Sequence, residues 1–546
     1  MRIIVAALEN MEALRYHSST STRTVRLQGH SGRDFRIHCR AMRSHLPLIA
    51  VVALATGSLQ AQPFPWFGVA APKGLTDPHR PILDVSPLAP AAARVPPGEE
   101  GHRDLAGAVI RKDLEAIVGI ARADRARGEK AWGRITGYRG ADETHAWVLQ
   151  QFKAAGLRDV DTQTYRATQP NWYPKRWEVK LVANSAAGSG ARDVVLESAF
   201  PTSGSRLAGP LTAPLVFVGG TTDAALPDVN VAGRVAVQTL HPQGGAYSER
   251  TRTTERAREL ARRGAVAVLN VVEQAGNMHV RDFSNCGMPC FNLGTDDGRF
   301  VTTVIERARA AGTLAELRVA ISLETEMRDG LKGHNTIGTV TGRNAGEMVI
   351  VNAHADGWFD AAGDNGDGLA VLIALARHFA RPAHQPERTL LFVASGGHHG
   401  AGMNGPGNLV SMNPQLKGTV VLVLNLEHIA QLQFRNDPFR VDANEQPMGF
   451  GISNEAPAIA DVARRGMARY GFNLRPDFSS SIAGDLGGYA PLEVPRVQAI
   501  HSGPMYHTSG DTLDTISTAG LERAARFYAF FVNQIAGTPA AELQAK

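Results

Sequence analysis

The chain has 546 residues, of which 43% are hydrophobic and 20% are charged, and its net charge is +5. This length exceeds a single hydrophobic core and predicts more than one folded unit. The excess positive charge lies within residues 1–43, because residues 1–41 carry a net charge of +4 and Arg43 adds one. The remainder is neutral overall, so we expect no nucleic-acid partner.

Residues 42–61 have the pattern of a signal peptide: a basic start, an apolar run from Leu46 to Ala55 and a small-residue cleavage pattern ending at Ala61. The run is too short for a stable membrane span. We therefore expect a secreted or periplasmic protein, with an amino-terminal anchor as the alternative. Residues 1–41 are rich in Ser and Arg, which indicates either an extended start or an organelle-targeting segment.

Export changes the interpretation of the cysteines. Without Cys39, the chain keeps only Cys286 and Cys290, in NCGMPC. An even pair in an oxidising compartment can form a disulfide, and two free thiols are the alternative.

After the signal peptide, residues 62–102 are rich in Pro and Ala, which indicates an extended linker or a segment laid over the surface. The first part of the larger domain, which is split by an insert, is expected at 103–186. Amphipathic helices are predicted over 104–126 and 141–157, and a strand is predicted over 160–165.

Residues 187–331 have the composition of a compact β-rich insert, with short apolar strands separated by Gly, Pro and Asp. Its expected elements are strands at 213–220, 233–240, 265–272 and 288–293 and a helix at 255–265. The main part of the larger domain is expected at 332–546, ending in an amphipathic helix over 521–537.

In this last part, metal-binding residue types recur just after apolar strands, where ordinary turns would carry Ser, Asn or Gly. The set consists of His354 after MVIVNA, Asp364 before a predicted helix, His398 and His399 after RTLLFVA, Glu427 after TVVLVLN, and His507 after VPRVQAI. Ligands collect outside the carboxyl ends of strands in α/β sheets, so these residues can converge into a metallohydrolase site.

Each of these residues taken alone is more often an ordinary polar residue than a ligand, and it is the repetition that favours a site. Two aspartates are candidates for supporting roles. Asp356 stands two residues after His354 and can accept its second ring N–H, and Asp511 could serve His507 in the same way. The chain shows no internal repeat, coiled coil, phosphate-binding Gly loop or serine-nucleophile motif.

The ordered motifs HAD, DN, FVAS before a residue pair, NLEH and YHT with a following Asp resemble those of the bacterial di-zinc aminopeptidases related to glutamate carboxypeptidase and the transferrin receptor. The resemblance runs from about Asp104 to Ile535. It implies an α/β fold, with a mixed sheet flanked by helices, and a smaller β-rich protease-associated domain as the insert at 187–331.

The resemblance also implies a ligand set for two zinc ions. The residue corresponding to Asp364 bridges both ions, and His354 and Glu427 complete one site. The other site takes Asp364, His507 and the second residue of a Glu-Glu pair, whose first residue is the general base.

This chain departs from the family at that pair, where His398 and His399 stand. His399 can still bind zinc, so one or two zinc ions are expected. His398 is the candidate proton acceptor, although adjacent dications would lower its pKa.

The sequence thus predicts an exported zinc metallopeptidase of the aminopeptidase type that hydrolyses a peptide or small amide substrate by metal-activated water. Loss of the glutamate base keeps open a catalytically silent protein that binds peptides or partners. A related zinc amidase or cyclase is a further alternative. The residue preference and the oligomeric state do not follow from the sequence.

Overall fold

The structure is a computed structural model that describes residues 64–76, 84–85, 91–221, 223, 225–241, 250–274, 276–281, 287–436, 439–445, 448–454, 456–472, 474–477, 484–500, 503 and 505–544. The extended start predicted at 1–41, the signal peptide predicted at 42–61 and Cys286 lie outside the described residues.

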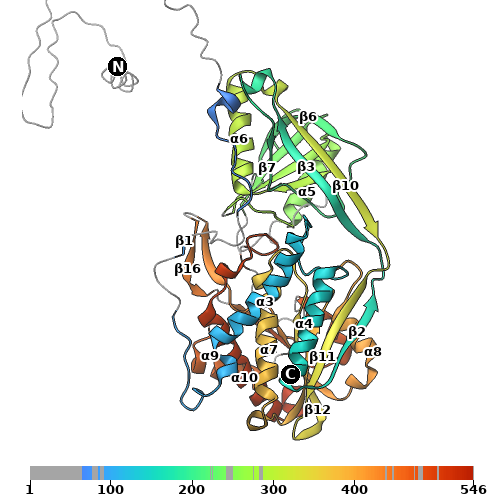
Figure 1. The fold of residues 1–546 in the computed structure, drawn as a ribbon, viewed down its shortest axis with the longest axis vertical. Coiled ribbons are helices and arrows are strands. Elements are labelled where there is room, and N and C mark those ends of the chain that lie inside the picture. The colour runs from blue at the N-terminus through green and yellow to red at the C-terminus, as the bar shows by residue number, and fades with distance from the viewer. Residues whose placement is uncertain are drawn as a thin grey trace, which may run out of the picture. The chain divides into compact units, whose positions relative to one another are not determined.

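The part that the sequence predicts to be catalytic, called the catalytic part below, is built on a mixed sheet of eight strands (Figure 1). Their order across the sheet is β18 (Leu474–Asp477), β17 (Met448–Ile452), β19 (Arg496–Ile500), β14 (Val420–Leu426), β12 (Asn344–His354), β13 (Arg388–Ser395), β11 (Lys332–Val340) and β2 (Arg158–Arg166). The neighbours β19, β14, β12 and β13 run parallel, and antiparallel strands flank them. The predicted mixed sheet is confirmed.

The parallel strands are apolar along their length because both faces of the sheet are covered. One face packs against α3 (Gly107–Ala126), α4 (Arg139–Ala155), α7 (Asp367–Phe379), α9 (Pro457–Tyr470) and α10 (Thr518–Gly537). Helix α7 is apolar nearly all round because α3, α4 and α10 pack on it from outside. The opposite face packs against α8 (Gly405–Met412) and the 3-10 helix η9 (Gly484–Leu492).

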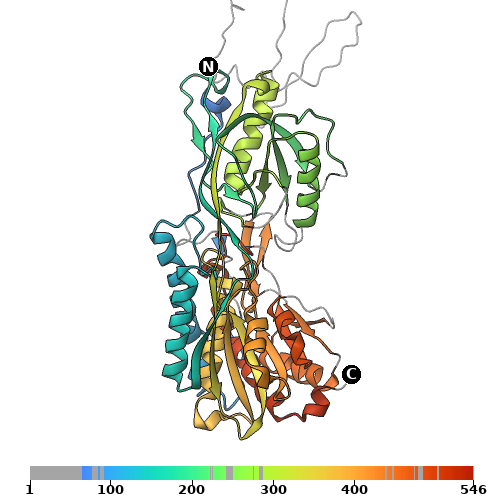
Figure 2. The same cartoon turned by 90° about the vertical axis from the view of Figure 1, so that its right-hand side faces the viewer.

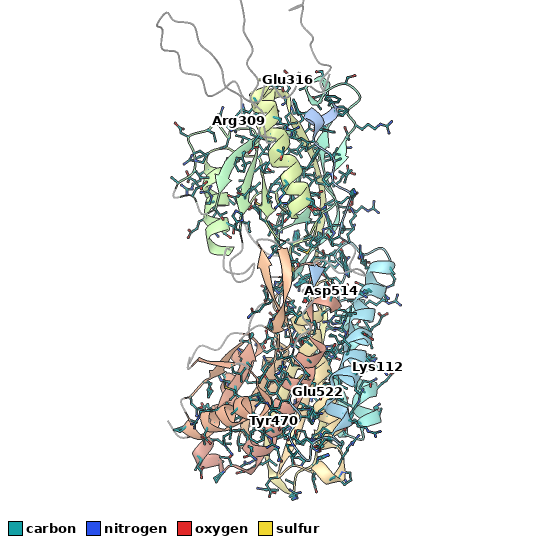
Figure 3. The ribbon with its side chains drawn as sticks, turned by 90° about the vertical axis from the view of Figure 1, so that its left-hand side faces the viewer. Lys112, Arg309, Glu316, Tyr470, Asp514 and Glu522 are labelled. Carbon is teal, nitrogen blue, oxygen red and sulfur yellow. The ribbon has the colours of Figure 1, made fainter. Side chains whose placement is uncertain are left out.

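A second sheet of eight strands forms the insert. Its order is β4 (Val194–Val195), β3 (Asn171–Val182), β10 (Arg318–Arg328), β6 (Leu211–Gly220), β7 (Val235–Leu240), β8 (Ala267–Val272), β9 (Cys290–Leu293) and β5 (Phe200–Pro201). Helices α5 (Arg250–Arg262) and α6 (Thr295–Ala310) cover its two faces, as Figure 2 shows. In Figure 3, Arg309 and Glu316 mark this part, and Lys112 and Glu522 mark the helices of the catalytic part.

The second sheet begins earlier in the chain than residue 187, where the composition changes. Strand β3 starts at Asn171 and pairs antiparallel with β10 along its whole length. Buried and more exposed residues alternate along much of β3, as they do in any half-buried strand. Composition alone therefore could not assign β3 to the second sheet rather than to the sheet of the catalytic part.

The described part of the Pro- and Ala-rich segment lies along the surface. Trp66, in η1 (Pro65–Gly68), is 4% exposed and packs edge-to-face on Phe300 of α6. Farther along, Glu99 accepts hydrogen bonds from Arg469 and Tyr470. Strand β1 (Asp84–Val85) pairs with β16 (Phe439–Glu445), which pairs with β15 (Leu432–Asn436) in a third, small sheet.

The remaining elements are short. They are α11 (Ala540–Leu543), the turn η6 (Ala362–Gly366), and 3-10 turns η2 (Arg103–Leu105), η3 (Ser185–Ala187), η5 (Leu314–Glu316), η7 (Pro382–His384), η8 (Pro414–Leu416) and η10 (Leu513–Thr515). Within the described ranges, no helix combines the length and the apolar character needed to cross a membrane.

Candidate metal centre

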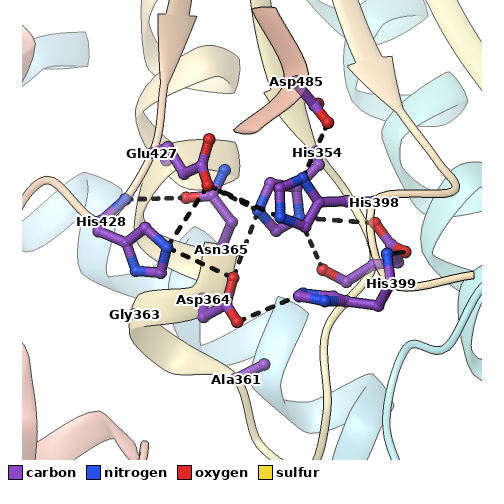
Figure 4. Close-up of polar contacts among 12 residues, drawn as sticks. His354, Ala361, Gly363, Asp364, Asn365, His398, His399, Glu427, His428 and Asp485 are labelled. Atoms are coloured by element: carbon purple, nitrogen blue, oxygen red, sulfur yellow. Dashed lines mark hydrogen bonds and ion pairs between the residues drawn. The ribbon is translucent and has the colours of Figure 1, made fainter. Parts of the chain in front are cut away.

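The carboxyl ends of the four parallel strands bring the predicted ligands together. His354 is the last residue of β12, His398 and His399 follow β13, Glu427 follows β14, and His507 lies in the turn after β19. Asp364 comes from η6, just before α7. The site lies at the edge of the sheet where the sequence predicted it, and Figure 4 shows most of its residues.

Asp364 lies at the centre of the cluster, and its two carboxylate oxygens face different histidines. Oδ1 lies 3.3 Å from Nε2 of His354, whereas Oδ2 lies 3.3 Å from Nε2 of His399 and 3.0 Å from Nε2 of His507. Zinc bonds of about 2.0–2.2 Å put neighbouring ligand atoms roughly 3.3–3.5 Å apart in a tetrahedron. These separations therefore match ligands that share an ion on each side of Asp364.

Glu427 completes the Oδ1 side. Its Oε1 lies 3.8 Å from Nε2 of His354 and 3.5 Å from Nε2 of His428. His428 was not among the residues predicted from the sequence, and its Nε2 also lies 3.6 Å from Oδ1 of Asp364.

The residues fit a metal by their chemistry as well as by their spacing. Nε2 of His354, Nε2 of His399 and both carboxylate oxygens of Asp364 are buried without a hydrogen-bond partner among the described residues. Buried polar atoms in proteins are nearly always hydrogen-bonded, so such a group of atoms needs another partner. Imidazole and carboxylate ligands suit zinc, and Asp364, His399 and His507 form a group compact enough to hold one ion.

The ionisation of these groups favours metal binding. Burial alone would raise the pKa of Asp364, but His399 and His354 hold that pKa well below its ordinary value. Burial lowers the pKa of His399 to about 4, against the opposing effect of Asp364. At neutral pH, Asp364 is therefore a carboxylate and His399 a neutral imidazole with a lone pair to offer.

Asp356 supports both sides of the site. Nδ1 of His354 donates to the backbone oxygen of Asp356 at 2.9 Å, and the carboxylate oxygen Oδ1 lies farther away, at 3.5 Å. The tautomer of His354 is thus set by the main chain of Asp356 as well as by its side chain. The other carboxylate oxygen accepts hydrogen bonds from Oγ1 of Thr136 and from the backbone N–H of His399.

Asp511 supports the central aspartate. Its carboxylate accepts hydrogen bonds from the backbone N–H groups of Gly363 at 2.8 Å and Asp364 at 2.9 Å. Burial, together with the neighbouring charge of Asp364, raises the pKa of Asp511 to about 7.

Arg134 fixes the loop between two ligands. Its fully buried guanidinium donates to the backbone oxygens of Ala355, Asp360 and Ala361. These contacts hold the chain between His354 and Asp364. No local sequence pattern marks Arg134, because its partners are main-chain atoms more than 200 residues away.

Residues 335–532 match the family described as Peptidase family M28. The candidate ligands from His354 to His507 all lie within this matched region. A comparison with curated proteins gave no match.

Two solved structures are similar in fold. The peptidase M28 precursor from Shewanella amazonensis SB2B is 18% identical, with 79% of this chain and 97% of that chain covered and a TM-score of 0.56. BSAP, a zinc aminopeptidase from Bacillus subtilis, is 19% identical, with 80% and 98% covered and a TM-score of 0.54. Family and fold together support a metallopeptidase, and the family points to zinc.

Within the region that matches family M28, His398 is held by an aspartate that the sequence did not single out. Its Nδ1 lies 2.9 Å from Oδ1 of Asp485, in η9, and its ring stacks on His354 with the ring centres 4.0 Å apart. Asp485 is fixed in turn by Asn352 and Ser395, which donate to its Oδ2. Burial and His354 lower the pKa of His398, but Glu427 and Asp485 outweigh them and raise it.

A cavity of about 110 Å³ opens beside His399. Five aromatic side chains line it: Tyr138 from just before α4, Trp172, Tyr173 and Phe200 from the insert, and Trp358 from the segment after β12. Arg281 lies over the ring of Trp358 at 4.4 Å and donates to Oγ of Ser203. The cavity places apolar surface next to the metal-binding residues.

Cys290, at the start of β9, is disulfide-bonded. Cys286, the partner predicted from the sequence, lies outside the described residues. The pairing of Cys286 with Cys290 therefore stays a prediction.

Proposed function

We propose that this chain is an exported zinc-dependent metallopeptidase of the aminopeptidase type. The observation that carries the proposal is the position of Asp364, whose two carboxylate oxygens face separate histidines at 3.0–3.3 Å. A carboxylate in that position can bridge two ions, with His354 and Glu427 on one side and His399 and His507 on the other.

Zinc bound by these residues would lower the pKa of a water molecule and polarise the carbonyl of the scissile amide. The protein's own task is then to take a proton from the nucleophile and return it to the leaving amine. His398 is the residue proposed for this step. Asp485 accepts the hydrogen bond from Nδ1, which leaves the lone pair of Nε2 directed toward the ligands, 3.8 Å from Oε1 of Glu427.

The aromatic cavity beside His399 is the proposed position of the substrate side chain next to the scissile bond. Its walls favour a bulky apolar residue, since aromatic surfaces contribute both burial and ring contacts. The insert supplies part of this wall. We propose that it is a protease-associated domain that shapes access to the site.

Metal analysis of the purified mature chain, paired with a panel of aminoacyl-anilide substrates, tests the proposal. We expect bound zinc together with turnover. Zinc without turnover on amino-terminal substrates, but with release of ammonia or a cyclised product from amides, would favour a related zinc amidase or cyclase.

The second candidate is a catalytically silent protein that binds peptides or partners. What supports it is the resemblance, which implies a glutamate base at the position of His398. Bound zinc, no turnover on any amide and retained peptide binding would support this reading over the enzyme.

Export is a separate part of the proposal and rests on the pattern at residues 42–61. Amino-terminal sequencing of the exported protein should find Gln62 first. A mature chain that began upstream of Met42 would contradict it.

A further inference from the structure

Residues 279–281 of the insert pair with the loop that carries His507. The backbone N–H of Arg281 donates to the carbonyl oxygen of His507 at 2.9 Å, and the backbone N–H of Ser509 donates to the carbonyl oxygen of His279 at 2.9 Å. Between these two bonds the segments form an antiparallel bridge. The insert therefore contacts the main chain of a candidate metal ligand, in addition to lining the aromatic cavity.

A side chain of the loop adds a third bond. Oγ of Ser509 accepts a hydrogen bond from the backbone N–H of His279 at 3.0 Å, and Ser509 is buried. His279 is itself fixed, because its Nδ1 donates to the carbonyl oxygen of Ser198 at 3.1 Å and its ring packs against Phe200 and Phe359. The loop is thus bound to a residue that has little freedom to move.

Three buried amides hold the next residue of the insert, Val280. Asn292 of β9 donates to the carbonyl oxygen of Val280 at 2.9 Å. The side-chain oxygen of Asn292 accepts from Asn270 of β8 at 2.9 Å, and that of Asn270 accepts from Gln238 of β7 at 2.8 Å. All three amides are fully buried, where a lost partner costs more than it does in water. The row of amides therefore ties residues 279–281 to three neighbouring strands of the second sheet.

The backbone of His507 needs such support. Its φ of +57° lies in the left-handed region, which few residues other than glycine adopt. Conformations of this kind persist only where the surrounding structure holds them. The bond from Arg281 fixes the carbonyl group of His507, while Nε2 of the same residue lies 3.0 Å from Oδ2 of Asp364. The direction of the imidazole thus depends on a contact with the insert.

We propose that the insert is a structural part of the metal centre, which holds His507 where its imidazole can bind zinc beside Asp364. Ser509 and Asn292 are positioning residues for this ligand. The inference rests on the proposed di-zinc function and adds to it a role for the insert beyond access to the site. The ion on the other side of Asp364, whose remaining candidate ligands come from the ends of β12 and β14, should not depend on these contacts.

Zinc affinity of the full mature chain, measured by competition with a chromophoric chelator, tests the proposal. Of two zinc equivalents, Ser509→Ala and Asn292→Ala should each weaken by about 3–10-fold only the one that His507→Ala abolishes, since each variant removes one hydrogen bond from the support of the loop. Ser509→Thr keeps the hydroxyl and its hydrogen bond, so its affinity should stay within about 2-fold of the wild type. Ser205→Ala is the matched control, because its buried hydroxyl donates to Cys290 of β9, elsewhere in the insert, and affinity should be unchanged.

The His507→Ala background separates positioning from a general loosening of the fold. There, Ser509→Ala should not change the affinity of the remaining zinc equivalent, because the ligand that Ser509 positions is gone. A loss that persists in this background, or a loss below about 2-fold in both variants of the intact site, would overturn the inference.

Thermal melting shows whether each variant is folded. If Asn292→Ala does not fold, Ser509→Ala and its combination with His507→Ala carry the test alone. A wild-type chain that binds no zinc would overturn the proposed function as well, whereas normal zinc binding that neither variant weakens overturns this inference alone.

Discussion

Nδ1 of His398 lies 2.9 Å from Oδ1 of Asp485, and the aspartate is buried. At this distance the ring N–H donates to the carboxylate, which selects the tautomer with its lone pair on Nε2. In the proposed mechanism, an imidazole with its own carboxylate partner takes the place of the glutamate base that the family resemblance implies. This relationship links β13 to η9 and gives the site a group that can accept a proton.

Replacing that partner should slow the reaction. In Asp485→Asn the Nδ1–H loses its charged acceptor, so we expect turnover to fall roughly 10–100-fold, part of what a general base typically contributes. Asp485 helps to raise the pKa of His398, and the base works when neutral. The acidic limb of kcat/KM should therefore move to lower pH in the variant. Ser395→Ala, which touches only the other oxygen of Asp485, should have a smaller effect. Unchanged turnover and pH profile would rule out a role for Asp485.

His398 itself should be needed for turnover but not for zinc content. We expect His398→Ala to reduce kcat by about 10²–10⁴-fold, the usual range for general-base catalysis. His398→Glu supplies the glutamate that the family resemblance implies at this position, and bound cations would keep its carboxylate ionised, so peptidase activity should rise. A fast wild-type enzyme that tolerates His398→Ala would mean that another group moves the proton.

Asp364 should be the residue on which zinc content depends most. Asp364→Ala removes an oxygen ligand from both proposed ions, so we expect elemental analysis to show loss of most bound zinc. Asp367→Asn is a matched control, since Asp367 is also buried and near the start of α7 but accepts its hydrogen bonds from the backbone of Gly368 and Ala430. Full zinc stoichiometry in Asp364→Ala would refute the bridging role.

The aromatic cavity should set the preference for the substrate side chain. Trp358→Ala removes one wall of the cavity and the ring under Arg281. We expect KM for phenylalanyl and leucyl anilides to rise roughly 2–10-fold, the value of one aromatic contact, with kcat for alanyl substrates nearly unchanged. An equal loss for all substrates would indicate damage to the metal centre instead.

The stability of the fold should fall in acid partly through His378. Burial, with the neighbouring charges of His384 and His102, lowers the pKa of His378 to about 3. The unfolded chain therefore binds a proton that the folded chain does not, and stability is lost as pH falls from about 6.5 towards 3. In His378→Gln, Tm should drop less between pH 7 and pH 4 than in the wild type. Arg381 and Arg526 also face this histidine and remain charged throughout.

Sequence patterns predicted several elements of the insert but not the residue at which it begins. Its strands β6 to β9 and helix α5 were predicted within a few residues, because each carries its own apolar periodicity and turn residues. The start of the insert was not predicted, because β3 joins the second sheet by pairing with β10, which lies more than 100 residues later in the chain. Strand pairing over such a distance leaves no local signal.

In the candidate metal centre, too, some residues could be predicted from the sequence and others could not. His354, Glu427 and the pair His398 and His399 could be predicted because each follows an apolar strand, and parallel strands end at one edge of a sheet. His428 could not, because alternation along a strand predicts that the neighbour of Glu427 points away, and only its left-handed backbone reverses this. Asp485 comes from η9, on the opposite face of the sheet to α7, and Arg134 binds main-chain atoms. The sequence determined which strands carry the candidate ligands. The tertiary structure decided which side chains from other layers contact and orient them, since those contacts depend on packing between segments far apart in the chain.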